Sequence, residues 1–167
     1  MRTLLAVILL LLSSTLLFAD EHSVNFDAGT DFSKLKSFAF RLAKCDSTLP
    51  EINSSLYMKN LLGIIGASLV AKGLKEESAD HADVLVDVRF DGLESSSPGT
   101  VGNRPGEGHP GMVYVQGTLN IELFSREQKL LVWEGIYRER EDNASRLARR
   151  YHEDAKALLL QYPPKKK

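Results

Sequence analysis

Two adjoining runs of alternating apolar and polar residues constrain the fold of this chain more than any other feature. The first run, residues 112–124 (MVYVQGTLNIELF), places apolar side chains on one face of a strand and polar side chains on the other. The second, residues 129–140 (KLLVWEGIYRER), follows after the short polar connection SREQ, and this spacing predicts a β-hairpin. Alternation of this kind is typical of an antiparallel sheet that is covered on one face. The core-facing residues expected in the first run are Val113, Val115, Leu119, Ile121 and Leu123.

Three further segments show strand patterns. Residues 83–90 alternate strictly, with valines on the core side and Asp83 and Asp87 on the side expected to face water. Shorter runs at residues 23–27 and 37–42 predict two strands near the start of the domain.

Two amphipathic helices are available to cover the sheet. The first starts near Pro50 or Asn53, which compete as start signals, and ends before Gly73. Its apolar stripe consists of Met58, Leu61, Leu62, Ile65 and Leu69. The second begins near Asn143, a good N-cap, and stops before the Pro163-Pro164 pair. Its inward stripe consists of Leu147, Ala148, Tyr151, Ala155, Leu158, Leu159 and Tyr162.

The element order is therefore β-β-α-β-β-β-α. This order predicts an α+β two-layer sandwich, with a mainly antiparallel sheet of about five strands and two helices on one face.

The N-terminal segment has the pattern of a signal peptide. Arg2 precedes an apolar run of about fifteen residues, shorter than the roughly twenty that a membrane-spanning helix needs. We expect cleavage after Ala19, which leaves residues 20–167 as a single domain; membrane association is expected only if the segment stays uncleaved. Lys and Arg number 21 against 22 Asp and Glu, so charge gives no reason to expect a nucleic acid partner. Cys45 is the single cysteine, which excludes an intrachain disulfide.

Four stretches in order resemble a known family. They are DFSKLKSFAF (31–40), SLVAKGLKEESADHADVLVDV (68–88), GTLNIELFSREQKLLVWEG (117–135) and ALLLQYPPK (157–165). Together they are similar to the domain of unknown function family 4136, found mainly in exported bacterial envelope proteins, many of them described as lipoproteins. The resemblance implies an α+β fold and an envelope location, and it brings no activity or catalytic residues. This chain departs from many members because it lacks the lipid-attachment cysteine, which favours a periplasmic or secreted form without a lipid anchor.

An acidic stretch, ESADHADVLVDV (77–88), contains the residue types that bind metals or transfer protons. Asp83 and Asp87 lie four residues apart on a predicted strand, about 13 Å at 3.3 Å per residue, so they cannot share one metal ion. Asp80 and His81 fall in the connection between helix and strand, where polar residues are usual. We interpret the stretch as a structural joint and predict no metal, cofactor or catalytic residue.

Two segments are candidates for contact with a partner. The glycine- and proline-rich segment 92–111 is predicted to be a flexible loop, and its Arg104, Glu107 and His109 are the first candidates. A basic face of the last helix, formed by Arg146, Arg149 and Arg150, is the second; residues 163–167 are expected to be a solvated tail. Trp133 and Tyr137 fit core packing better than a ligand-binding face.

The sequence favours an exported, non-enzymatic domain that binds or scaffolds another envelope component. One alternative is a carrier with a small-molecule pocket between sheet and helices. Another is a hydrolase with a site near His81, Asp83 and His109.

Overall fold

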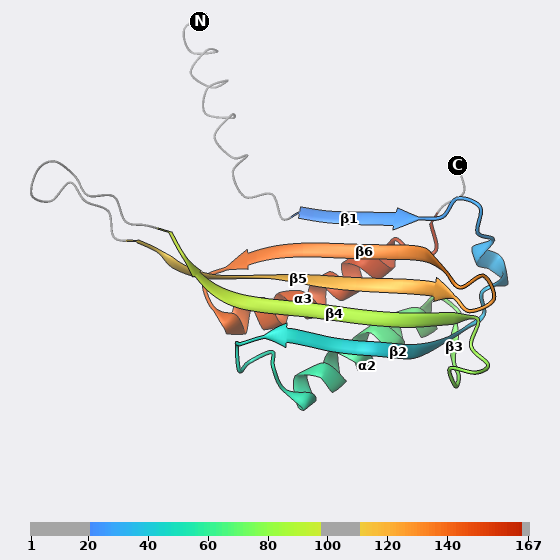
Figure 1. Ribbon diagram of the computed structural model, residues 1–167, viewed down its shortest axis with the longest axis horizontal. Helices are drawn as coiled ribbons and strands as arrows, with labels where there is room; N and C mark the ends of the chain where they lie inside the picture. The colour runs from blue at the N-terminus through green and yellow to red at the C-terminus, as the bar shows by residue number, and fades with distance from the viewer. Residues whose placement is uncertain (1–20, 98–110, 165–167) are drawn as a thin grey trace, which may run out of the picture.

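The computed structural model describes residues 21–97 and 111–164, in which a six-stranded sheet carries two long helices on one face (Figure 1). The spatial order of the strands is β1-β6-β5-β4-β2-β3. This arrangement confirms the predicted α+β sandwich, with six strands in place of about five. The strands are β1 (Glu21–Phe26), β2 (Ser37–Ser47), β3 (Lys75–Glu76), β4 (Val84–Ser96), β5 (Val113–Ser125) and β6 (Leu130–Glu141).

The additional strand is β3, which pairs in parallel with the start of β2 at the edge of the sheet. Both of its residues are exposed, so it carries no alternation of apolar and polar positions that could announce it. It is held instead by backbone hydrogen bonds from Lys75 to the Lys36 carbonyl and from Glu77 to the Phe38 carbonyl.

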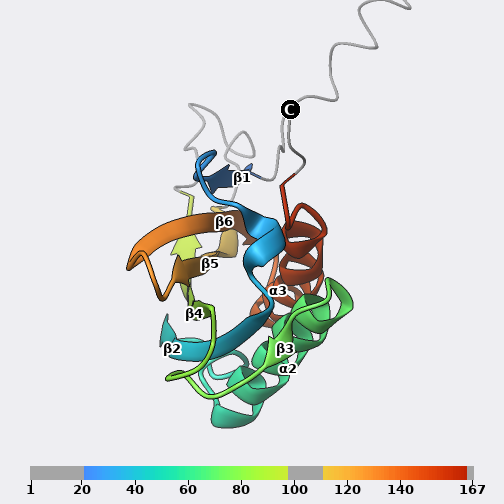
Figure 2. The same cartoon turned by 90° about the vertical axis from the view of Figure 1, so that its right-hand side faces the viewer.

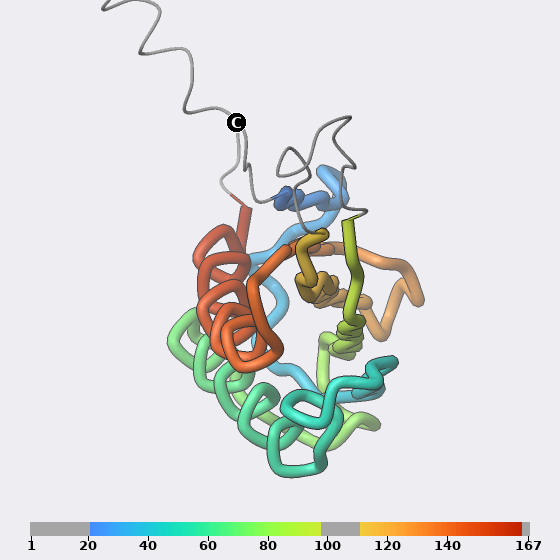
Figure 3. The backbone as a smooth tube through the Cα atoms, turned by 90° about the vertical axis from the view of Figure 1, so that its left-hand side faces the viewer, coloured from blue at the N-terminus to red at the C-terminus, as the bar shows by residue number. Residues whose placement is uncertain are grey.

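The sheet is mixed. Strands β4, β5, β6 and β1 pair antiparallel in succession, whereas β2 pairs in parallel with β4. Parallel neighbours require a crossover, and α2 (Ser55–Ala71) lies in the connection from β2 to β4. α3 (Ala144–Leu160) follows β6, and Figures 2 and 3 show α2 and α3 side by side on the same side of a curved sheet.

Both long helices begin at a polar side chain that accepts a backbone N–H. Asn143 Oδ1 accepts from Arg146 N–H at 3.0 Å, as predicted for α3. For α2 the prediction of Pro50 or Asn53 was wrong, because Ser54 is the cap and its hydroxyl accepts from Tyr57 N–H at 3.1 Å. The Asn53 amide is turned the other way and donates to the Ser47 carbonyl.

The end of α2 depends on Gly73, as expected. Its φ of +92° lies in the left-handed region that favours glycine. In this conformation Gly73 N–H reaches the Val70 carbonyl and Leu74 N–H reaches the Leu69 carbonyl, which satisfies two groups at the helix end.

The predicted core of β5 is confirmed except at its first residue. Val115, Leu119, Ile121 and Leu123 are at most 3% exposed, whereas Val113 is 68% exposed. Val113 pairs with Ser96 of β4, beyond the last β5–β6 pair, in a part of the hairpin that extends past the helices (Figure 1). β4 itself continues to Ser96, past the predicted loop start at residue 92.

The packing of α3 on the sheet requires a residue without a side chain at position 117. A Cβ atom on Gly117 would lie 2.0 Å from the Tyr151 hydroxyl oxygen and 2.6 Å from the Asp91 carbonyl oxygen. The Tyr151 hydroxyl donates to that carbonyl, so Thr118 N–H bonds to the Asp91 carboxylate at 2.8 Å instead. Gly117 therefore allows a helix side chain to reach the backbone of β4.

Candidate functional site

The acidic joint at residues 77–88 is structural in its central part. Asp83 Oδ2 accepts from Lys36 N–H at 2.8 Å and from the backbone N–H and hydroxyl of Ser37, both at 3.1 Å. These bonds tie the start of β4 to the start of β2. His81 is exposed, and its backbone N–H closes a turn onto the Ser78 carbonyl. The carboxylate that a hydrolase site near His81 would use is thus already engaged with backbone.

The prediction that Asp87 faces water was wrong. The residue is 2% exposed although it lies on the sheet face without helices. Arg41 closes over it with two hydrogen bonds of 2.8 Å, and Arg89 lies 3.4 Å from the same carboxylate while pairing with Glu122. Two cations and two anions balance in this cluster, so it offers no net charge to a ligand.

The remaining candidate residue types, namely metal ligands, the cysteine and Trp133, also have structural surroundings. Within residues 21–97 and 111–164, no group of three His, Cys, Asp or Glu side chains is placed to hold a metal ion. Cys45 is half-buried with its thiol 3.7 Å from the Ile52 carbonyl, and burial raises the pKa of that thiol, which disfavours the reactive thiolate. Trp133 is fully buried and meets Tyr162 edge-on at 5.9 Å, as expected of a core residue.

The predicted basic face of the last helix is largely engaged within the chain. Arg146 pairs with Asp142, and Arg150 pairs with the buried Glu139 at 2.9 Å as well as with Glu141 and Glu153. Arg149 is exposed. The loop candidates Arg104, Glu107 and His109 lie outside the described residues, so their role stays a prediction.

A groove between α2 and α3, on the side turned away from the sheet, is the candidate binding site in the described part of the chain. Its volume is about 720 Å³. Gly63, Ile64, Ala67 and Ala71 of α2 supply an apolar floor. The remaining lining residues are Lys59, Asn60 and Ser68 of α2 and His152 and Lys156 of α3.

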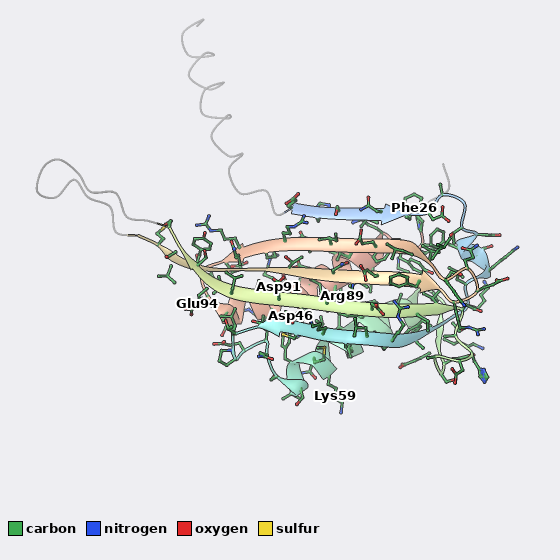
Figure 4. All side chains as sticks on the ribbon, in the orientation of Figure 1. Phe26, Asp46, Lys59, Arg89, Asp91 and Glu94 are labelled. Atoms are coloured by element: carbon green, nitrogen blue, oxygen red, sulfur yellow. The ribbon has the colours of Figure 1, made fainter. Side chains whose placement is uncertain are left out.

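The outer surface of α2 around this groove is unusually apolar for an exposed helix. Leu56 is 67% exposed and Val70 is 54% exposed, while Gly63, Ala67 and Ala71 are exposed as well. Lys59 is the single charged residue among the helix's seventeen (SLYMKNLLGIIGASLVA), and Figure 4 shows it projecting away from the sheet. A helix that is apolar on all sides is typical of one that is covered on all sides.

Among the described residues, the charged side chains that line the groove are all basic. Lys59 and Lys156 lie on opposite helices, and both are exposed. His152 stacks on Tyr57 with ring centroids 5.1 Å apart, and its buried Nε2 makes no hydrogen bond to any described residue. Burial and the neighbouring Lys156 lower the pKa of His152. The Ser68 hydroxyl donates to the Ile64 carbonyl, so it is already satisfied within α2.

The sequence of α2 contains a pattern that indicates this groove, separate from the apolar stripe that faces the sheet. Gly66 lies on the inner side and packs beneath Phe40, where a Cβ would be 3.6 Å from the ring. Gly63 has no atom within 4 Å of its Cβ position. The spacing Gly63, Ala67, Ala71 opposite an inward Leu and Ile stripe would have predicted a second apolar face.

The fold and groove define an α+β sandwich domain with an exposed apolar surface on its helical layer. The model of the domain of unknown function family DUF4136 matches residues 22–164, and the chain belongs to this family. The resemblance seen in the sequence is confirmed. No curated protein sequence matches the chain.

Several solved structures share the fold. One is a PDZ domain protein from Parabacteroides distasonis, with 16% identity and a TM-score of 0.63 over 90% of this chain but only 37% of that chain. A DUF4136 family protein from Bacteroides thetaiotaomicron has 12% identity and a TM-score of 0.55, covering 86% of this chain and 96% of that one. A neuraminyllactose-binding hemagglutinin homolog from Helicobacter pylori has 12% identity and a TM-score of 0.51, covering 80% and 88%. Identities this low establish a shared fold alone.

Neither α2 nor α3, nor any other helix within the described part of the chain, has the length and hydropathy that a membrane crossing demands.

Proposed function

We propose that this chain is an exported bacterial cell-envelope domain, periplasmic or secreted, that acts by binding or scaffolding another envelope component and catalyses no reaction. The observation that carries the proposal is the exposed apolar outer face of α2. Contiguous apolar surface on a folded domain marks a site of interaction, because leaving it in water costs free energy in proportion to its area.

Two further observations support the proposal. The leader-like pattern of residues 1–19 favours export, and the sequence resemblance to a family found mainly in exported envelope proteins implies the same location. The acidic residues that first suggested chemistry serve the fold, since Asp83 binds backbone N–H groups and Asp87 is enclosed by arginines.

The test is site-specific photocrosslinking in cells that produce the tagged full-length chain. A photoreactive residue at Ala67, on the outer face of α2, should form adducts with an envelope component, which mass spectrometry would identify. The matched control is the same residue at Lys44, exposed on β2 away from the groove. We also expect the intact mass of the exported form to correspond to a chain that begins at residue 20.

Equal adduct yields at the two positions would refute the α2 face as the contact surface. Retention of the full-length chain in the cytoplasm would refute the envelope location.

A further inference from the structure

The groove between α2 and α3 has a shape, a floor and a charge that together restrict what can occupy it. It follows α2 from Lys59 to Ala71, which is about three helical turns or about 18 Å at 1.5 Å per residue. Most of its lining residues are exposed, so it is open along its length. Small-molecule pockets enclose most of the ligand's surface, and an open groove of this kind suits a longer, rod-like occupant better.

The floor favours an α-helix in particular. Gly63, Ala67 and Ala71 repeat at intervals of four, so they lie in one row along α2. Small residues in such a row let the backbone of a second helix approach closely, and open space above Gly63 leaves room for its side chains.

The charge of the groove discriminates between possible helices. Lys59 and Lys156 flank the floor and His152 lies beside them, while no acidic side chain from residues 21–97 or 111–164 lines the groove. This basic lining belongs to a chain whose overall formal charge is −1. The α2 helix of a second copy would bring Lys59 as its single charge, which adds repulsion. Complementarity requires carboxylates beside the apolar stripe.

On the basis of the proposed function, we infer that the groove between α2 and α3 binds an amphipathic helix of a partner protein, about three turns long, whose apolar stripe is flanked by acidic residues. Such a helix places its apolar stripe over Gly63, Ala67 and Ala71. Its carboxylates then lie near the ammonium groups of Lys59 and Lys156. The bound helix would lie outside α2 and α3 and would cover the apolar outer face of α2.

The test uses the exported chain, residues 20–167, and two fluorescent designed peptides of three to four helical turns. Both carry the same leucine and alanine stripe, flanked in one by Glu and in the other by Lys at the same positions. Fluorescence anisotropy should show the Glu peptide binding at least tenfold more tightly than the Lys peptide. Raising the salt concentration should narrow this difference, because the flanking charges are exposed.

Two variants locate the binding to the groove. Lys59→Glu with Lys156→Glu should weaken binding of the Glu peptide at least tenfold and favour the Lys peptide. The control, Lys34→Glu with Lys129→Glu, makes the same change in charge at exposed residues outside the groove and should leave both affinities unchanged.

Gly63→Leu adds a large side chain at an exposed position of the floor, where the space around the Cβ position is open, and it raises helix propensity, so the variant should fold. It should abolish binding of the Glu peptide, while Gly63→Ala, which leaves most of the space, should retain it.

Equal binding of the two peptides, or no binding of either, would overturn the inference. Two other results would also overturn it: groove-dependent flotation with phosphatidylglycerol vesicles in place of peptide binding, or a dimer in sedimentation that Gly63→Leu dissolves. In those cases adducts formed in cells from Ala67 would still support the proposed function, because that experiment asks only whether the α2 face is a contact surface. Absence of such adducts would count against the function independently of the peptides.

Discussion

Gly117→Ala is the substitution whose effect follows most directly from the packing of α3 on the sheet. The added methyl group would lie 2.0 Å from the Tyr151 hydroxyl oxygen and 2.6 Å from the Asp91 carbonyl oxygen. The second atom is backbone of a paired strand, so the methyl group cannot be accommodated by turning a side chain. Tyr151 must move away, and its hydrogen bond to Asp91 is lost.

Two terms contribute to the expected loss of stability. Overpacking in a filled core costs about 1–3 kcal/mol. A buried hydrogen bond whose partner is displaced costs a further amount of about 1–3 kcal/mol. We therefore expect the free energy of unfolding to fall by about 2–6 kcal/mol. The melting temperature should fall by about 2–4 °C for each kcal/mol lost in a domain of this size.

Urea denaturation of the exported chain measures this change, and a double-mutant cycle with Tyr151→Phe assigns its cause. The phenylalanine removes the atom that lies 2.0 Å away, so Gly117→Ala should cost less in that background than in the wild type. Gly63→Ala is the matched control. With no atom within 4 Å of its Cβ position, it should stabilise the domain by up to about 1 kcal/mol. An equal cost of Gly117→Ala in both backgrounds, or a neutral effect, would refute the reasoning.

Two other predictions concern the stability contributed by half-buried polar side chains, those of His152 and Asp83. Burial and Lys156 lower the pKa of His152, so the unfolded chain takes up a proton first, and stability should fall as the pH drops below about 6.5. His152→Phe keeps the stack on Tyr57 and should lose less stability between pH 7.5 and 5.5; identical losses in wild type and variant would contradict this assignment. Asp83→Ala removes the acceptor of three hydrogen bonds and should cost about 1–3 kcal/mol in urea denaturation, whereas Asp80→Ala, at an exposed position, should change stability by less than about 0.5 kcal/mol. Equal effects of these two substitutions would argue against a structural role for Asp83.

The sequence predicted the sheet well wherever one face of a strand meets the helices. Valines at alternate positions of β4 and the matching residues of β5 are buried because period-two alternation follows from strand geometry itself. The prediction that Val113 is buried was wrong because this residue lies beyond the helical layer. Alternation carries no information on where that layer ends. Strand β3 was not predicted because its two residues are both exposed and show no alternation, while backbone hydrogen bonds pair it with β2.

Asp87 shows why burial of a polar residue is harder to predict. Arg41 comes from another strand, and it lies at an irregularity in β2 where the register shifts between Phe40 and Leu42. Forty-six positions separate the two residues along the chain. No local pattern around Asp87 announces that a distant arginine will close over it. The prediction that Asp83 and Asp87 share no metal ion depended on strand spacing alone.

The outer side of α2 is more apolar than its place in the fold requires. Helices α2 and α3 have equal lengths and cover the same face of one sheet, yet α3 carries six charged residues and α2 carries one. The demands of the sheet cannot account for this difference, because both helices bury one side against it. A helix needs only one apolar side to satisfy one contact, so the apolar residues on the outer side of α2 are in excess of what this fold requires. The single strongest apolar stripe of α2 faces the sheet, so that stripe gives no information on the apolar residues of the outer side. These apolar residues border the groove, where Lys59, His152 and Lys156 lie beside a floor of small residues. A partner helix bound in the groove would explain why the outer side of α2 is apolar.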